Sequence, residues 1–442
     1  MAALGIIMTY ILGIRREDKN KWERRVPLTP EHVKKIYENN NIKTVIQPSK
    51  IRIFSDEEYR SVGAEVNEDL SSSSVIFAIK EIPIDFFEKN KTYVFFSHTI
   101  KGQKHNMPML KKMMELGCNL IDYEKITDSN GRRLVFFGRY AGIVGMIDTL
   151  WAFGQRMKCK GISAPLSEIK QTIHYKNLKE AKYHLDEISK RIKQDGFPDS
   201  ISPIVIGLAG YGNVSKGAQE IIDILPFEEI APSQLKSIHL NPSNKVIYKV
   251  VFKEKDMFER ISNDKDFSLQ EYYSRPDLYR SVFHNFVPFL SILMNCIYWN
   301  KQYPRLITKD YLKSNYSKNF KLQIVGDISV DINGAVEFTE KVTSPDNPVF
   351  TFNPLKFNIT DGYNGDGIVV MAVDNLPCEV PRDSSKAFND SLNPFIQSIV
   401  KADFSVDFDN LNLPPEIKKA VILYHGKLTP AYEYLINHLQ VS

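Results

Sequence analysis

The segment "SPIVIGLAGYGNVSKGAQEIIDIL", residues 202–225, restricts the fold more than any other part of this chain. It reads as an apolar strand, a tight glycine turn and a helix, the context in which the motif Gly-x-Gly-x-x-Gly binds a dinucleotide. Gly210 and Gly212 hold the first two glycine positions, and Ser215 stands at the third. The segment therefore predicts a parallel α/β domain. A Rossmann-like turn that binds nothing is the alternative.

The residues of this turn have separate expected roles. Gly210 allows the sharp bend, and Gly212 lets the backbone approach a pyrophosphate. The amides of Asn213 and Val214 open the following helix, whose positive end suits an anion. Ser215 is a small replacement for the third glycine, and we expect its hydroxyl to be able to donate to a phosphate.

The next strand of this unit is expected in "FEEIAP", residues 227–232. An NAD site usually has an acid near the end of that strand, where it holds the ribose 2′-hydroxyl. Glu228 and Glu229 come too early in the strand, and Ser233 and Lys236 follow it. Because no carboxylate would repel a 2′-phosphate there, the sequence favours NADPH over NADH.

Strand and helix patterns alternate along the rest of the chain, as in parallel α/β units. They predict a first α/β domain that ends near residue 138. A helix from Ala141 to Lys158 could then carry the chain into a second domain. The region 252–281 is rich in charge and tyrosine, and we expect it to be an insertion.

Bulk properties place the chain in the ordinary globular class. Its 442 residues have room for two or three domains, and 43% of them are hydrophobic and 25% charged. Lys and Arg number 57 against 53 Asp and Glu, and they are dispersed, so nucleic acid is not expected as a partner. The cysteines form no CxxC pair and the histidines no HExxH spacing, so a metal site is not expected either.

The apolar opening "MAALGIIMTYILGI" raises the question of targeting. It lacks the basic region of a signal peptide and the Arg/Ser-rich character of a mitochondrial presequence, and it is too short to span a bilayer. We expect its end, Met8 to Ile14, to form the first strand of a domain. The cytosol is the expected compartment, without a membrane partner, and import into the mitochondrial matrix stays open.

Polar residues follow three expected strands of the first domain, at the strand ends where α/β proteins bind ligands. Arg25 ends the basic loop "RREDKNKWERR", and an arginine fork suits a carboxylate; a solvated basic loop is the alternative. Lys80 follows an apolar strand with Glu81 beside it, and His98 ends the next strand. Such a pair can act as acid and base. A surface lysine and a structural histidine are the alternative reading.

Six blocks of the sequence carry a wider resemblance. They are "RREDKNKWERRVPLTPEHV", "KTYVFFSHTIKGQ", "LIDYEKI", "GRYAGIVGMIDTL", "GNVSKGAQ" and "VDNLPCEVPRDSS". Together they resemble the lysine–2-oxoglutarate reductase half of the aminoadipic semialdehyde synthase family. The resemblance runs from about Ile11 to about Tyr434. More distantly, the chain is similar to lysine-forming saccharopine dehydrogenase, alanine dehydrogenase and the soluble part of transhydrogenase.

The resemblance implies an α/β fold of two Rossmann-like domains with parallel sheets that flank a cleft, the cofactor domain being inserted into the other. Residues 8–139 would form the first part of the substrate domain, 140–334 the NAD(P)-binding domain, and 335–442 the return to the substrate domain with C-terminal helices. It also implies an oxidoreductase that acts on a CH–NH bond. L-Lysine would condense with 2-oxoglutarate, and NADPH would reduce the imine to saccharopine, the first step of lysine degradation.

The resemblance also implies site residues, position by position. Lys80 and His98 match the family's acid–base pair. The substrate-binding positions are Arg25, Glu81, Gln103, Glu124 and Arg133. Together with the glycine turn, the cofactor-binding positions are Arg132, Gly210, Gly212, Asn213, Val214, Ser215, Ser233, Asn295, Asp327, Asp374 and Asn375.

Three alternatives stay open at this point. A related amino-acid dehydrogenase, of the alanine or NAD-linked saccharopine type, would keep the fold and change the substrate. An NADPH-binding regulator would keep the fold without catalysis. Since the animal family protein continues into a saccharopine-cleaving half, the chain would be either a monofunctional reductase beside a separate saccharopine dehydrogenase or one half of a longer enzyme.

Overall fold

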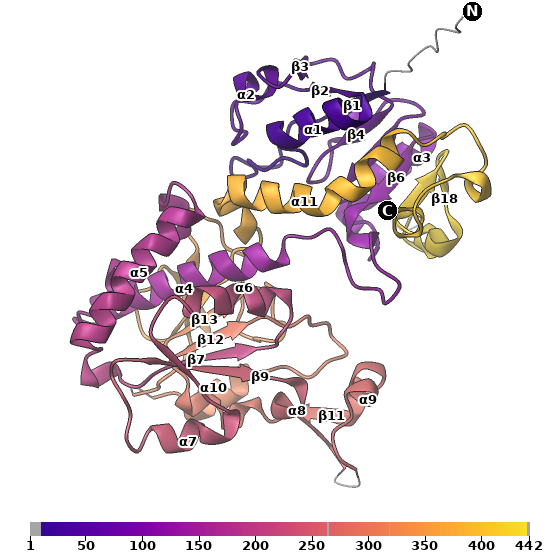
Figure 1. Cartoon of the computed structure of the whole chain (residues 1–442). Coiled ribbons are helices and arrows are strands. Elements are labelled where there is room, and N and C mark those ends of the chain that lie inside the picture. Colours follow the sequence, from indigo (N-terminus) through magenta and orange to yellow (C-terminus); the bar gives the residue numbers. More distant parts are fainter. Residues whose placement is uncertain (1–9, 263–264, 318, 440–442) are drawn as a thin grey trace, which may run out of the picture. The chain divides into compact units, whose positions relative to one another are not determined.

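The computed structural model describes residues 10–262, 265–317 and 319–439, and it divides into two compact units. Unit 1 consists of Met1–Phe137 and Pro381–Ser442, and unit 2 of Gly138–Val380 (Figure 1). Unit 2 is therefore inserted between two chain segments of unit 1. The expected fold class is confirmed, because each unit is a Rossmann-like layer of helices on a mostly parallel sheet.

Unit 1 is built on eight strands. These are β1 (Tyr10–Ile14), β2 (Ile42–Ile46), β3 (Glu65–Val66), β4 (Val75–Phe77), β5 (Thr92–Phe95), β6 (Asn119–Asp122), β17 (Val421–Tyr424) and β18 (Lys427–Leu428). Their order is β18-β17-β6-β5-β4-β1-β2-β3, with β1 to β6 parallel and β17 antiparallel to both of its neighbours. The first strand was expected from Met8, and Met8 and Thr9 lie outside the described residues.

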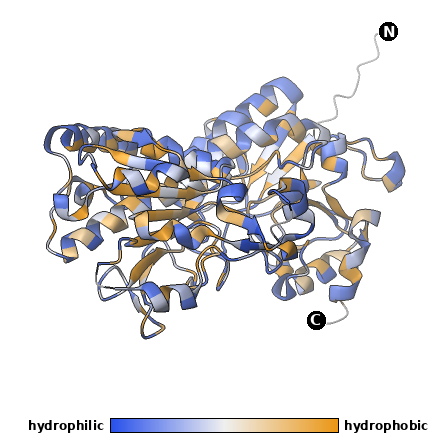
Figure 2. Cartoon of the chain, turned by 90° about the horizontal axis from the view of Figure 1, so that it is seen from below, coloured by the Kyte–Doolittle hydropathy of each residue, from blue (hydrophilic) through white to orange (hydrophobic). Residues whose placement is uncertain are grey.

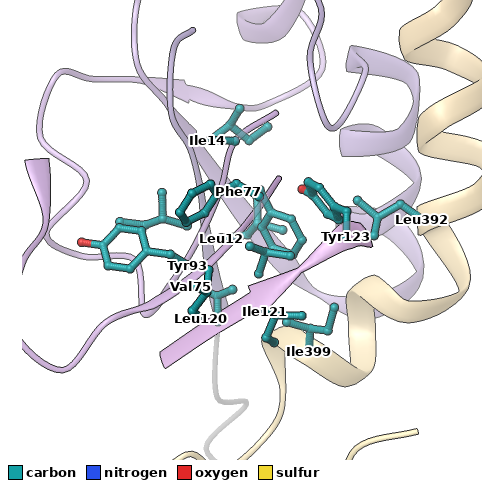
Figure 3. Packing of buried hydrophobic residues seen from close by; sticks show 14 of the residues in the cluster. Leu12, Ile14, Val75, Phe77, Tyr93, Leu120, Ile121, Tyr123, Leu392 and Ile399 are labelled. Atoms are coloured by element: carbon teal, nitrogen blue, oxygen red, sulfur yellow. The ribbon is translucent and has the colours of Figure 1, made fainter. Parts of the chain in front are cut away.

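The helices of unit 1 come from both of its chain segments. They are α1 (Pro30–Asn40), α2 (Asp56–Arg60), α3 (Met107–Glu115), α11 (Pro381–Val400), α12 (Pro415–Lys418) and α13 (Ile436–Leu439). Figure 3 shows Ile399 of α11 beside Ile121 of β6, and Leu392 of α11 beside Tyr123, which follows β6. Each such buried side chain contributes about 1.5–3 kcal/mol. The C-terminal segment is thus part of the core of unit 1.

Unit 2 also holds eight strands in one sheet. These are β7 (Ile204–Ala209), β8 (Phe227–Glu229), β9 (Ile247–Phe252), β12 (Ile292–Asn295), β13 (Ile324–Asp327), β14 (Val349–Asn353), β15 (Asn358–Asp361) and β16 (Ile368–Met371). Their order is β15-β14-β16-β13-β12-β7-β9-β8; β14 is antiparallel to both of its neighbours, β15 and β16, and the other pairs are parallel. The central strands are buried along their whole length, as expected for parallel strands covered on both faces.

Outside the insertion described below, the helices of unit 2 are α4 (Gly138–Cys159), α5 (Leu178–Asp195), α6 (Asn213–Ile222), α7 (Leu235–Ile238) and α10 (Lys309–Asn315). Apart from α4, which is buried along most of its length, the longer helices mix hydrophobic and hydrophilic residues, whereas the strands are mainly hydrophobic (Figure 2). No helix in the described parts of the chain is long and apolar enough to cross a membrane.

The end of the inserted unit differs from the expectation. The return to unit 1 was expected at residue 335, and it lies at Pro381. The reason is that β14, β15 and β16 extend the sheet of unit 2 beyond β13. An apolar strand pattern does not state which of two sheets the strand joins, because that choice depends on distant hydrogen-bonding partners.

The region after β9 forms a small subdomain of unit 2. It contains α8 (Glu254–Met257), β10 (Phe258–Arg260), α9 (Leu269–Ser274) and β11 (Tyr279–Ser281). The two strands pair antiparallel as a ribbon of their own, apart from the main sheet. This ribbon occupies the expected insertion, and α8 and α9 bring acidic and tyrosine side chains to the end of β9.

Two glycines let α4 and α6 pack backbone to backbone. A Cβ atom added at Gly142 would lie 1.8 Å from the carbonyl oxygen of Val214, and one added at Gly217 would lie 1.9 Å from that of Arg139. Real Cβ atoms do not approach so closely, so only glycine fits these positions. The contact fixes α6, and with it the glycine turn, against the long helix α4.

Unit 2 also buries a pair of carboxyl groups. Asp148 of α4 is fully buried and accepts a hydrogen bond from the Thr172 amide at 2.8 Å. Glu379 is 6% exposed and accepts one from the Ile173 amide at 3.1 Å. Burial raises the pKa of both carboxyl groups, and the two interact with each other. A proton shared between the two carboxyl groups removes the repulsion between two buried negative charges and gives each group a hydrogen bond.

We expect this pair to make the stability of the protein fall as the pH rises. A carboxyl group whose folded pKa is raised contributes stability below its unfolded pKa, and that contribution is lost as the pH rises through the folded pKa. Asp148→Asn keeps the acceptor for Thr172 and removes one charge, so it should raise the stability at pH 8 by about 1–3 kcal/mol and leave it nearly unchanged at pH 5. Thermal unfolding at both pH values measures this.

Asp195→Asn, at the exposed end of α5, is the matched control and should not change the pH dependence. Equal pH profiles for Asp148→Asn and the unmodified chain would contradict the shared proton.

Candidate active-site residues

The first cluster of predicted residues lies at the switch point of the unit 1 sheet. β1 lies between β2 and β4, so the connections that leave β1 and β4 diverge at their carboxyl ends. Ligands of open α/β sheets bind in the crevice at such a point. The loop of Arg15 to Arg25 follows β1, Lys80 follows β4, and His98 follows the adjacent β5. The structure thus brings these three segments to one edge of one sheet.

Lys80 is held by its backbone. Glu17, which is 7% exposed, accepts hydrogen bonds from the amides of Ile79 at 2.6 Å and Lys80 at 3.0 Å. Burial and the nearby charge of Arg25 lower the pKa of the Lys80 amine. Burial, together with the neighbouring carboxylate of Glu23, raises the pKa of Glu17 to about 7. The neutral form of Lys80 is therefore favoured compared with a lysine in water.

His98 belongs to a charged chain with Glu81 and Lys19. Its Nδ1 lies 2.7 Å from Oε1 of Glu81, and Nζ of Lys19 lies 2.9 Å from Oε2 of the same carboxylate. Hydrogen bonds from His98 and Lys19 outweigh burial and hold the pKa of Glu81 well below its usual range. His98 also has a φ of 47°, a left-handed conformation that is strained for a residue other than glycine. Such strain is concentrated at functional sites.

Arg25 lies in the same cluster, but a neighbouring residue engages its fork. Its Nε and Nη2 donate to the two oxygens of Glu23 at 2.7 and 2.6 Å, and its guanidinium stacks on Phe137 with 4.1 Å to the ring centre. Arg25 is 2% exposed and Glu23 is fully buried. Arg25 and Glu23 therefore form a buried ion pair near Lys80. A substrate carboxylate that binds Arg25 would have to approach it around Glu23.

The other predicted substrate residues lie in two separate places. Gln103 precedes a short 3-10 helix (Lys104–Asn106), and its Oε1 accepts from the amide of Lys101 at 3.2 Å. Glu124, just after β6, forms an ion pair with Arg133. Arg132, predicted to bind cofactor, is exposed and pairs with Asp128 at 2.7 Å.

The glycine turn lies at the switch point of the second sheet, where β7 lies between β9 and β12. Gly210 has a φ of 96°, which only glycine adopts readily. Gly212 is the N-cap of α6, and a Cβ atom there would meet nothing within 4 Å. Open space before the helix, where Asn213 and Val214 supply the first amides, is what a pyrophosphate requires. This geometry fits a dinucleotide.

Ser215 has a different role from the one expected. It is fully buried, and its Oγ accepts a hydrogen bond from Nε2 of Gln219 at 3.1 Å. The expected phosphate contact is therefore wrong for this side chain. Ser215 faces the packed side of α6, which is where the third glycine of the motif serves helix packing.

Asn295 and Asp327 form a buried polar network at the ends of β12 and β13. Nδ2 of Asn295 donates to Asp327 at 2.8 Å, and Thr339 donates to the same carboxyl at 2.6 Å. Burial raises the pKa of Asp327 to about 6. Oδ1 of Asn295 is buried without a partner among the described residues. Since an unpaired buried acceptor is costly, this oxygen fits a hydroxyl or amide donor of a bound cofactor.

Asp374 and Asn375 follow β16 at the same edge of the sheet. Asp374 is exposed, and Asn375 begins a short 3-10 helix (Leu376–Glu379). They lie two strands beyond Asn295, with β13 between β12 and β16.

Ser233 does not lie beside the glycine turn. It was expected there because "FEEIAP" was taken as the strand next to β7, and that expectation is wrong. β8 is the edge strand, and β9 separates it from β7. Lys249 of β9 also pairs with Glu229 of β8 at 2.9 Å, so this carboxylate is used within the sheet.

Sequence analysis missed three carboxylates near the predicted sites, two in unit 1 and one in unit 2. Glu17 and Glu23 lie in the basic loop, where the arginines alone were considered. Glu254 follows β9, the strand beside β7, and thus holds the position at which an acid was sought. Glu254 could have been found from the sequence, because it is an acid that follows an apolar strand. Glu17 and Glu23 could not, because their burial depends on residues that are distant in the chain. No group of three or more His, Cys, Asp or Glu side chains that could hold a metal ion occurs among the described residues.

Two protein-family models match segments of this chain. The model of the alanine dehydrogenase/PNT N-terminal domain matches residues 13–144, and that of the alanine dehydrogenase/PNT C-terminal domain matches residues 296–431.

Among curated proteins, the chain is similar to alpha-aminoadipic semialdehyde synthase of Arabidopsis thaliana, with 38% identity over 96% of this chain and 41% of the relative. Mitochondrial alpha-aminoadipic semialdehyde synthase of Bos taurus is 34% identical over 98% of this chain and 48% of the relative. The chain therefore spans less than half the length of these relatives. Saccharopine dehydrogenase [NAD(+), L-lysine-forming] of Yarrowia lipolytica is 26% identical over 89% of this chain and 93% of the relative.

Among solved structures, an L-alanine dehydrogenase superposes with a TM-score of 0.64 at 16% identity, covering 97% of this chain and 99% of the other. The transhydrogenase from Sinorhizobium meliloti gives a TM-score of 0.54 at 13% identity, with 95% and 100% covered. At these identities the similarity establishes the fold.

Proposed function

This chain belongs to the alanine dehydrogenase/PNT family, and on that premise we propose that it is an oxidoreductase that condenses L-lysine with 2-oxoglutarate and reduces the product to saccharopine. The substrate assignment is supported by the similarity to alpha-aminoadipic semialdehyde synthases over almost the whole chain. The reaction would be the first step of lysine degradation, with saccharopine passed to a second activity.

The observation that carries the proposal is the cluster of Lys80, Glu81 and His98 at the switch point of unit 1. An amine with a lowered pKa beside a histidine–carboxylate pair supplies what imine formation needs, a proton acceptor and a proton donor in one place. A binding module has no use for a lysine whose pKa is lowered at a strand end.

Lys80 is proposed to take a proton from the substrate amine. The incoming ε-ammonium of lysine must lose a proton before its nitrogen can attack the keto carbon. Because the pKa of Lys80 is lowered by burial and by Arg25, its neutral form can accept that proton. Glu17 keeps Lys80 in place through the two backbone amides.

His98 is proposed to exchange protons with the substrate oxygen. In the protonated ring, Nδ1–H donates to Glu81 and Nε2–H is left to give its proton to the carbinolamine hydroxyl, which then leaves as water and leaves the ring neutral. Glu81 fixes the orientation of the ring, and Lys19 fixes Glu81. Gln103, Glu124 and Arg133 are proposed to bind the polar ends of the substrates, and Arg25 a carboxylate.

A nicotinamide dinucleotide, when bound, supplies the hydride for the imine carbon. The turn of Gly210 and Gly212 would hold its pyrophosphate, and Asn295 its nicotinamide ribose. We propose Asp327, Asp374, Asn375 and Arg132 as further cofactor positions. The strand β8, after which the absence of an acid favoured NADPH, lies at the sheet edge, so the choice of dinucleotide depends on the residues that follow β9.

The test is turnover of the purified chain with reduced dinucleotide. Oxidation of the cofactor should require lysine and 2-oxoglutarate together, and mass spectrometry should identify saccharopine as the product. Omission of either substrate should abolish the rate. Pyruvate with ammonia, the substrates of an alanine-type reaction, serves as the comparison. A protein that binds the dinucleotide and turns over neither pair would refute the proposal and leave the regulator as its replacement.

A further inference from the structure

Asp122, the last residue of β6, is a fully buried residue whose carboxylate fastens two loops of unit 1. Its Oδ2 accepts hydrogen bonds from the amide of Ser97 at 3.0 Å and from the Ser97 hydroxyl. Its Oδ1 accepts a hydrogen bond from the amide of Glu124 at 2.7 Å. Ser97 directly precedes His98 after β5, and Glu124 follows β6. One side chain therefore joins the loop of the acid–base histidine to the loop of a proposed substrate-binding residue.

The hydrogen bonds of Asp122 act on the strained backbone of His98. The φ of 47° at His98 is left-handed, and such a conformation persists only where the surrounding structure fixes it. Ser97 and Thr99, on either side of His98, are both fully buried, and their hydroxyl oxygens lie 2.7 Å apart. Because Ser97 uses its hydroxyl hydrogen for Asp122, Thr99 is the donor between the two hydroxyls. Asp122 thus fixes both neighbours of His98.

Asp122 is itself anchored in the core of unit 1. Its amide donates to the carbonyl oxygen of Ala420 at 3.0 Å, and Ala420 is fully buried just before β17. On the other side of the link, Glu124 forms an ion pair with Arg133. A rigid anchor of this kind keeps reacting groups in place, and a displacement of about 1 Å can lower a rate by about 10²-fold.

We propose that Asp122 is a positioning residue for the reaction, which holds His98 and Glu124 in the arrangement that turnover requires. The inference rests on the proposed function, because it assigns a role within the same site. Asp122 is fully buried and acts on the reaction through the two loops. A carboxylate suits this role because its two oxygens accept hydrogen bonds from both loops at once, whereas a side-chain amide has a single acceptor oxygen.

Asp122→Asn tests the inference with little change in shape. The amide oxygen can serve one loop, but the amide nitrogen would face an N–H donor of the other loop, so one loop is released. We expect kcat/KM with lysine and 2-oxoglutarate to fall by about 10–100-fold, with unchanged binding of the dinucleotide. Ser97→Ala keeps both backbone hydrogen bonds and removes only the hydroxyl contact beside His98. It should lower kcat by about 3–10-fold and leave both KM values unchanged.

Asn119, at the other end of β6, provides the matched control. It is 1% exposed, its Nδ2 donates to Oγ1 of Thr92 at 3.0 Å, and its Oδ1 accepts from the amide of His425 at 2.7 Å. Asn119→Ala should lower the unfolding temperature, as Asp122→Asn should, but leave kcat/KM unchanged. A kcat/KM for folded Asp122→Asn within about threefold of the unmodified chain, or an equal loss in Asn119→Ala, would overturn the inference. If Asp122→Asn does not fold, an unchanged kcat for Ser97→Ala would overturn it.

Crystal structures separate this inference from the proposed reaction. If the unmodified chain forms no saccharopine, the proposed reaction is refuted, and the structure of Asp122→Asn decides the positioning role. Displacement of His98 or Glu124 by about 1 Å or more, or loss of the left-handed φ of His98, would support that role. Unchanged positions of both loops would overturn it. Saccharopine formation at an equal rate by the unmodified chain and Asp122→Asn would refute the positioning role alone.

Discussion

Lys80→Met should lower the turnover with lysine and 2-oxoglutarate by about 10²–10⁴-fold, the usual contribution of a general acid–base group. Methionine fills a similar volume but cannot carry a proton, so the change removes chemistry and keeps packing. The backbone contacts of this position to Glu17 do not involve the side chain and should persist. Initial rates at saturating substrates measure the effect.

Two further variants make the result specific to proton transfer. Lys80→Arg restores the positive charge with a group that stays protonated, so it should remain as slow as Lys80→Met. Lys89→Met, at an exposed position after the same strand, should turn over normally. Dinucleotide binding should be unchanged in all three variants. A Lys80→Met or Lys80→Arg rate within about threefold of the unmodified chain would remove Lys80 from the acid–base chemistry.

Glu23→Gln should destabilise the protein by about 3–5 kcal/mol, the usual cost of removing one partner of a buried ion pair. Glu23 is fully buried and holds two nitrogen atoms of Arg25, which is itself 2% exposed against Phe137. Glutamine can accept one of these hydrogen bonds, but it cannot balance the charge. Urea denaturation, followed through the loss of secondary structure, measures the change.

The same substitution should also affect Lys80. The carboxylate of Glu23 raises the pKa of Lys80, whereas Arg25 lowers it. Since Lys80 must be deprotonated to accept a proton, the loss of Glu23 should shift the acidic limb of the pH–rate profile to lower pH. Glu57→Gln is the control, because Glu57 pairs with Arg60 at 3.0 Å on the surface. Such a pair contributes about 0–1 kcal/mol. Equal denaturation midpoints for Glu23→Gln and Glu57→Gln would contradict the role of the buried pair.

Much of the fold could be read from local patterns. The strand β7, its glycine turn and helix α6 follow from an apolar run, a glycine with a left-handed φ and an amphipathic helix, all within residues 204–222. The placement of Lys80 and His98 after adjacent strands could be predicted for the same reason, because parallel strands end at one edge of a sheet. The comparisons confirm the family that these blocks resemble.

The order of strands could not be read in this way. The strand patterns of β8 and β9 do not state which of the two pairs with β7. Their order is set by hydrogen bonds between residues far apart in the chain. For that reason an acid after the strand beside β7 was sought near Ser233, whereas the residues that follow this strand are Lys253 and Glu254.

By itself, the sequence determined a dinucleotide-type turn, two α/β units and the identity of the acid–base candidates, because these depend on neighbouring residues and on strand ends. Only the tertiary structure decided which charges meet. Glu23 is buried against Arg25, and Glu17 accepts a hydrogen bond from the amide of Lys80. Glu81 lies within hydrogen-bond distance of His98, and Glu254 lines the same cavity as the glycine turn. The physical reason is that a charge is stabilised by partners that approach it in space, and those partners come from separate elements of the fold.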